Sequence, residues 1–235
     1  MSILTAIVNI FLAPSEAFPI LREKDSAQTR SIFLGILIFL GLINLAVLKD
    51  LYAEVQYEQT VERIENSSRI PEDQKEQLIL DMEDRFENPS PAAIGIMWLT
   101  NAISYPIRVL FMAFIVMMIG NFIFGGREKF ATILNMTALV YMVCILELLV
   151  KIPLMLNQWS IDIHTGLGIL GLGEPGSFLY YFMNGMDFFA AWRIVLLGLG
   201  AGYLYQKKPG GFIVALFIYW ILQNAFTAGL GALFV

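Results

Sequence analysis

Five ionisable residues stand inside long apolar runs of the sequence and are its strongest candidates for chemistry. They are Arg108, Glu147, Lys151, Asp187 and Arg193. A charge within a bilayer costs at least about 2.5 kcal/mol, so such groups usually face a bundle interior and find partners there. Three cations against two anions leave room for a bound anion or a cage of carbonyls. The set is either a charge network that fixes helix register or a site for an ion, proton or lipid headgroup.

Spacing suggests which of these groups meet. Glu147 and Lys151 are four residues apart, so on a helix they share one face and can pair. The apolar stretch 180–208 reads as one helix with Asp187 and Arg193 inside it. We expect Asp187 to pair with Arg193 or Arg108, with Trp192 packing in support of Asp187.

Motifs for catalysis or for holding a cofactor do not emerge from the sequence. It has no HExxH, no CxxC, no P-loop and no nucleophile beside a base. Residues 166–171 spell GxGxxG, but no strand precedes them, so a surface loop is the better interpretation. We therefore expect a protein that is not an enzyme and that binds no metal, cofactor or nucleic acid.

Composition indicates which elements must position the five groups. The chain of 235 residues is 57% hydrophobic and 15% charged, with a mean hydropathy of +0.68. These values are typical of a polytopic membrane protein. We predict an all-α membrane domain over residues 1–235 with five spans, at 31–48, 92–124, 130–156, 188–205 and 212–234.

Two segments fall outside the predicted spans. Residues 1–30 form a cytoplasmic or interfacial segment, whose apolar start is too short to cross a bilayer and fits an interfacial helix. Residues 50–90 are polar but patterned, and we predict a helical hairpin outside the membrane, with a turn at 66–68. Positions 49–87 hold 12 of the 20 acidic residues and 5 of the 15 basic ones. This acidic surface is either a solvated face or a docking surface for a basic partner or cations.

Basic residues outside the hairpin predict the orientation. They all fall on one side when the N-terminus is cytoplasmic, and five spans then place the C-terminus and the hairpin on the other side. These residues are Arg22, Lys24, Arg30, Arg127, Lys129, Lys207 and Lys208. Gly198 and Gly202 form a GxxxG pair in the fourth span, which favours close helix packing within the bundle, with a homo-oligomer face as the alternative.

Scattered positions across nearly the whole membrane part resemble the Yip1 domain family. They are Pro14, Phe18 and Leu21; Gly125, Gly126 and Phe130; and Asp187, Phe188, Trp192 and the stretch 195–198. The resemblance implies a five-helix integral membrane fold with a cytoplasmic N-terminus. It links eukaryotic members to vesicle traffic and Rab-type GTPases, while the compact form of this chain is more like bacterial members, which lack an assigned activity. The hairpin has no counterpart in the family pattern.

Together these observations favour a non-enzymatic protein of the bacterial inner membrane that organises the membrane through contacts with lipids or proteins. A protein partner would meet it at the hairpin or at the N-terminal helix. The alternative is a transporter or channel for a small ion or solute that uses the intramembrane charges.

Overall fold

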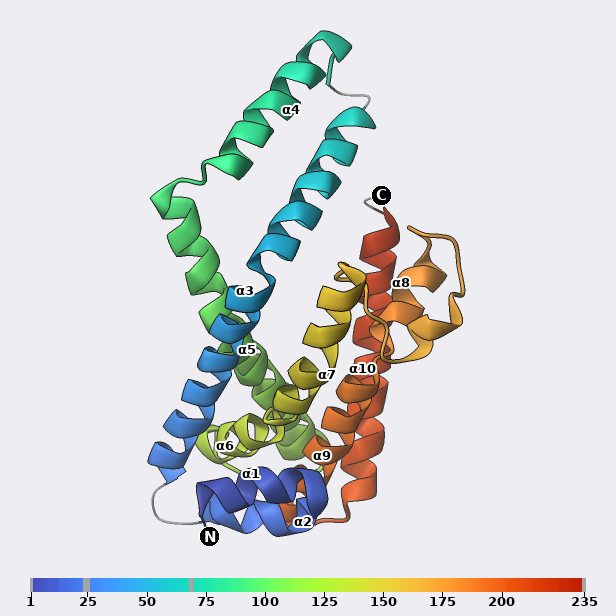
Figure 1. Cartoon of the computed structure of the whole chain (residues 1–235). Coiled ribbons are helices and arrows are strands. Elements are labelled where there is room, and N and C mark those ends of the chain that lie inside the picture. The colour runs from blue at the N-terminus through green and yellow to red at the C-terminus, as the bar shows by residue number, and fades with distance from the viewer. Residues whose placement is uncertain (1, 23–25, 68–69, 234–235) are drawn as a thin grey trace. The chain divides into compact units, whose positions relative to one another are not determined.

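The computed structural model describes residues 2–22, 26–67 and 70–233 (Figure 1). Over these residues the chain is helical and contains no β-strand, which confirms the predicted all-α fold. An isolated antiparallel bridge joins Gly166 and Asp187. Lys24, one of the bases used to predict orientation, and Ser68, in the predicted turn, lie outside the described residues.

Five helical stretches are long and apolar enough to cross a membrane, as predicted. They comprise α3 (Ser26–Glu65), α5 (Pro91–Met118) with the π-helical turn η2 (Ile119–Ile123), α6 (Phe130–Val140) with α7 (Val143–Gln158), α9 (Phe188–Tyr205) and α10 (Pro209–Leu233). The shorter elements are α1 (Ile3–Leu12), α2 (Pro14–Ala17), η1 (Phe18–Arg22), α4 (Glu72–Glu87), η3 (Leu167–Leu170) and α8 (Phe178–Gly185). The chain is thus an integral membrane protein.

The chain divides into two compact units, and each is described by itself. The first unit contains Met1–Leu37, Tyr105–Glu147 and His164–Val235. The second contains Ile38–Ser104 and Leu148–Ile163. Helices α3, α5 and α7 each contribute to both units.

The core of the first unit forms around α9, which packs against α10, α6 and α2. Small residues let these neighbours approach closely. A Cβ at Gly200 would press on Met136 and Phe18, and one at Gly198 would lie 2.9 Å from the Ile213 Cα atom. The GxxxG pair of Gly198 and Gly202 therefore faces the start of α10, within this chain.

The N-terminal helix α1 presents apolar side chains on two faces. The Ser2 side chain caps it by accepting from the Thr5 N–H at 3.0 Å. Ala6 and Ile10 are fully buried against the first unit, whereas Leu4 and Leu12 are 71% and 80% exposed. A helix with one packed apolar face and one open apolar face fits the predicted interfacial position, which stays a prediction.

The third predicted span is broken in the structure. It stops at Tyr141, where tight backbone bonds form a short turn before α7. One turn earlier, the Thr137 hydroxyl donates to the Ile133 carbonyl at 2.9 Å, a bond of the kind that bends helices. Neither a proline nor a glycine marks this break, so the sequence pattern misses it.

The stretch 180–208 is two helices rather than the single helix predicted from its apolar run. α8 ends at Gly185, and α9 begins at Phe188. Asp187 therefore does not lie inside a helix but is the N-cap of α9. The physical reason is that Asp is a strong N-cap and offers the backbone an alternative to helical bonding.

In the second unit α3 runs on to Glu65, although the predicted span ends at residue 48. Neither glycine nor proline occurs between Gly41 and Glu65, so nothing local stops the helix where the sequence turns polar. Figure 1 shows α4 folding back beside the end of α3. The rings of Tyr57 and Phe86 join the two helices, with centroids 5.2 Å apart.

Candidate functional site

The centre of the candidate site is an ion pair between α9 and α7, within the first unit. The Arg193 guanidinium donates to the carboxylate of Glu147. Both side chains are largely buried, with 18% and 16% of their surfaces exposed. A pair withdrawn from water in this way holds its two helices in a fixed register, because either charge alone would be strongly disfavoured there.

Two further residues complete the surroundings of Arg193, and sequence reasoning missed both in this role. The guanidinium lies over the Tyr141 ring at 5.6 Å, and its Nη1 atom lies 3.7 Å from the Cys144 Sγ atom. Tyr141, Cys144 and Glu147 follow one another at intervals of three residues and so share one side of the chain. That spacing is the signal by which the sequence could have revealed them.

Asp187 caps the N-terminus of α9. Its Oδ1 atom accepts from the Ala190 N–H at 3.0 Å, and its Oδ2 atom accepts from the Thr165 hydroxyl. The carboxylate predicted to pair with Arg193 or Arg108 thus has its described partners in Thr165 and a backbone amide. An anion at a helix N-terminus is also favoured by the helix dipole.

Backbone hydrogen bonds join the loop before α8 to the break between α8 and α9. The Leu167 N–H donates to the Met186 carbonyl at 2.9 Å, and the Phe188 N–H donates to the Thr165 carbonyl at 3.1 Å. A Cβ at Gly166 would overlap the Met186 carbonyl oxygen, so only glycine fits there. These bonds satisfy backbone groups that the break frees, as non-helical backbone at membrane depth requires.

Arg108 and Lys151 are placed differently from the Arg193 pair. The Arg108 guanidinium lies over the Tyr105 ring at 5.8 Å, and its side chain is exposed. Lys151 is half-buried and stands one helical turn after Glu147 on α7, in the part of that helix that belongs to the second unit.

Trp192 contacts the N-terminal helix. Its ring meets Phe11 of α1 edge-on at 6.2 Å and lies 5.9 Å from Phe188. The structure thus brings together Arg193, Glu147, Tyr141 and Cys144, and places Asp187 with Thr165. Within the described ranges, no three His, Cys, Asp or Glu side chains are grouped so that they could hold a metal ion.

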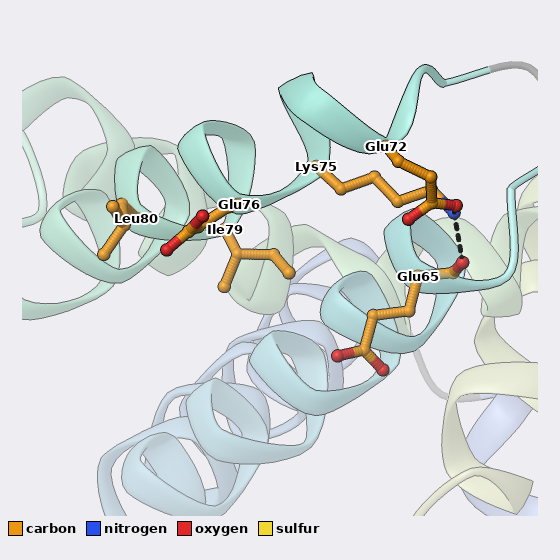
Figure 2. A pocket seen from close by; sticks show the side chains of 6 residues that line it. All are labelled: Glu65, Glu72, Lys75, Glu76, Ile79 and Leu80. Carbon is orange, nitrogen blue, oxygen red and sulfur yellow. Dashed lines mark hydrogen bonds and ion pairs between the residues drawn. The ribbon is translucent and has the colours of Figure 1, made fainter.

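A separate pocket of about 380 Å³ lies on the acidic hairpin, in the second unit (Figure 2). The Lys75 ammonium donates to the Glu65 carbonyl at 2.7 Å and to the Glu72 carboxylate at 2.6 Å. The carboxylates of Glu65 and Glu76 point away from Lys75. Glu72 is 87% exposed, so its ion pair contributes little to stability.

Comparison with known proteins agrees with the architecture. No curated protein and no solved structure shows a significant match to the chain. The model of the Yip1 domain family, in contrast, matches residues 8–230, which is nearly the whole chain. This protein, with its five candidate spans, therefore belongs to the Yip1 domain family.

Proposed function

We propose that this protein organises the membrane around it through contacts with lipids, without catalysing a reaction. Membership of the Yip1 family supports a membrane-associated role, and the family is not known as an enzyme family. The alternative of transport gains no support from the described residues, because the central charges are engaged in an ion pair and a helix cap.

One observation carries the proposal: α9 has apolar surface elements at both of its ends. At the Tyr205 end, Phe18 of η1 stacks on Tyr203 with centroids 6.0 Å apart, and Arg22 donates to the Leu204 carbonyl at 3.4 Å. These contacts fix the N-terminal segment beside the end of the span. The segment's α1 helix exposes Leu4, Val8 and Leu12 at helical spacing.

At the Phe188 end, the loop bonded to the helix break exposes a second apolar set. Its members are Leu167, Ile169, Leu170 and Leu172, each at least 45% exposed. We infer that α1 and this loop both enter the bilayer beside α9. Short apolar elements inserted beside a bundle displace lipid chains and change their packing, with a strength that follows the buried apolar area.

The orientation and localisation belong to the same proposal. Arg22 binds the Leu204 carbonyl, and Lys207 donates to the Phe124 carbonyl, so these bases lie where α5 and α9 end. Arg127 and Lys129 follow directly in the turn after α5. Bases gathered on one side favour a cytoplasmic N-terminus in a bacterial inner membrane, an outward C-terminus and an outward acidic hairpin at 50–90. We further propose the hairpin or α1 as the place for a protein partner.

Acyl-chain order measured by deuterium NMR in reconstituted vesicles tests the lipid contact. We expect the wild type to lower the order of the bulk lipid chains in proportion to the amount of protein. The double variant Leu4→Ser/Leu12→Ser should lose at least part of this effect. Leu80→Ser is the matched control, because Leu80 is also exposed, at 58%, but lies on α4 of the hairpin.

The results that support the lipid contact differ from those that would overturn it. Reduced perturbation in the double variant, with the Leu80→Ser protein behaving as wild type, supports the proposal. A folded double variant that disturbs the chains as strongly as wild type would overturn it, as would a wild-type protein that leaves chain order unchanged. Far-UV circular dichroism of each sample establishes that the variant is folded.

A further inference from the structure

Arg108 is an intramembrane cation of the first unit for which the structure shows no ion pair within the ranges that it describes. Arg193 is neutralised by Glu147, whereas no carboxylate in the described part of the chain forms an ion pair with Arg108. Among the described residues, its guanidinium contacts the Tyr105 ring at 5.8 Å. An aromatic face stabilises a cation but cannot neutralise its charge. The exposed guanidinium is therefore open to an anion from outside the chain.

The depth of Arg108 can be estimated from the helix ends. The Tyr205 hydroxyl donates to the Asn121 Oδ1 atom at 2.9 Å, so the ends of α5 and α9 meet at one level. At 1.5 Å per residue, Arg108 and Arg193 both lie about 20 Å from that level. In a hydrocarbon core of about 30 Å, this places Arg108 about 10 Å below the opposite border. A long side chain there reaches towards the headgroups of the nearer leaflet.

The surface beside Arg108 is a stripe of exposed apolar side chains along the same helix face. The stripe consists of Ile107, Phe111, Phe114, Met118 and Phe122, which are 54%, 57%, 47%, 36% and 74% exposed. It begins beside Arg108 and runs about 20 Å towards the level of Tyr205, so its first part lies in the leaflet nearer Arg108. A cation at one end of an apolar stripe is complementary to a lipid, whose headgroup meets the cation and whose acyl chain meets the stripe.

We propose that Arg108 binds the phosphate of an anionic phospholipid from the leaflet on the α8 side, with an acyl chain lying along the part of the stripe nearest Arg108, at Ile107 and Phe111. The planar guanidinium offers paired N–H donors that fit phosphate oxygens in a bidentate manner. The unmatched positive charge selects an anionic headgroup over a zwitterionic one. The stripe selects a lipid over free phosphate, because phosphate has no chain to cover it.

This inference deepens the lipid contact proposed above by naming a lipid class and a residue, and it rests on that proposal only in requiring the protein to lie in a bilayer. The two can fail separately. The Leu4→Ser/Leu12→Ser protein should still hold the anionic lipid, and the Arg108 variant should still lower bulk chain order.

Native mass spectrometry of the full chain, released from mild detergent, tests the site. The protein is titrated with phosphatidylglycerol, phosphatidylcholine or inorganic phosphate, as wild type and as Arg108→Gln, Arg108→Lys and Arg127→Gln. Arg127→Gln is the matched control, since it removes the same charge from the exposed turn after α5. We expect the first phosphatidylglycerol to bind about tenfold more weakly to Arg108→Gln, with Arg127→Gln unchanged. Arg108→Lys keeps the charge but loses the paired N–H donors of the guanidinium, so its affinity for phosphatidylglycerol should lie between those of the two other variants.

Three results would overturn the proposal. They are equal binding of phosphatidylglycerol by Arg108→Gln and wild type, equal binding of phosphatidylcholine and phosphatidylglycerol by wild type, and full competition by inorganic phosphate at matched concentration. If Arg108→Gln does not fold, Arg108→Lys decides: wild-type affinity for phosphatidylglycerol in that variant would show that the guanidinium does not make the contact.

Discussion

The guanidinium of Arg193 on α9 donates to the carboxylate of Glu147 on α7, and both side chains are more than four-fifths buried. Glu147→Gln would leave the Arg193 charge without its counter-charge in an apolar setting. We expect this change to lower the free energy of unfolding by about 3 to 5 kcal/mol. Chemical or thermal unfolding of the detergent-solubilised protein measures the loss, with Glu174→Gln, exposed in the loop before α8, as the matched control.

Replacing both partners gives the sharper test of the ion pair. In the double variant Glu147→Leu/Arg193→Met, no charge is stranded, and apolar side chains of similar volume fill the space. We expect most of the lost stability to return, because a buried ion pair is often no more stabilising than well-packed apolar groups. A double variant as unstable as the sum of the single ones would mean that the two residues act independently.

Asp187 should respond to substitution as a helix cap rather than as an intramembrane counter-ion. Asp187→Ala removes the acceptor for the Ala190 N–H, and we expect a loss of about 1 to 2 kcal/mol. Asp187→Asn keeps an oxygen at the same position and should cost only a few tenths, since Asn caps about as well as Asp. A loss of several kcal/mol in Asp187→Asn would instead show that the negative charge itself is needed. Thermal melting distinguishes the two results.

The contrast between Asp187 and Arg193 shows how far the sequence could predict this site. Apolar run length identified the five spans, and the bounds of the fourth match α9 to the residue. Partners depend on where helices break, and the break at Tyr141 carries no local signal of Pro or Gly. The bridge from Gly166 to Asp187 joins segments that no periodicity links. Sequence could thus name the charged residues but not pair them.

The Tyr205 ring packs between two glycines, so the effect of a Gly→Ala substitution on stability should depend strongly on its position. A Cβ at either Gly120 or Gly126 would enter the Tyr205 ring, which also stacks on Phe212 at 5.3 Å. We expect Gly126→Ala to cost about 1 to 3 kcal/mol, as other overpacked sites do. Gly35→Ala is the control, because nothing lies within 4 Å of its added Cβ and α3 should gain up to about 1 kcal/mol. Equal melting temperatures for the two variants would show that Tyr205 moves aside without cost.

The side of the membrane on which the acidic hairpin lies decides the orientation of every span. Glu76 is exposed on α4, and the buried Cys144 is the chain's sole cysteine. In a Cys144→Ala background, a Glu76→Cys protein should react with a membrane-impermeant thiol reagent in intact cells. Lys208→Cys, placed in the basic turn between α9 and α10, should react only after lysis. If Lys208→Cys reacted in intact cells and Glu76→Cys only after lysis, the topology would be the inverse of the predicted one. The bases around Arg22 and Lys207 would then lie outside the cytoplasm, against the charge rule.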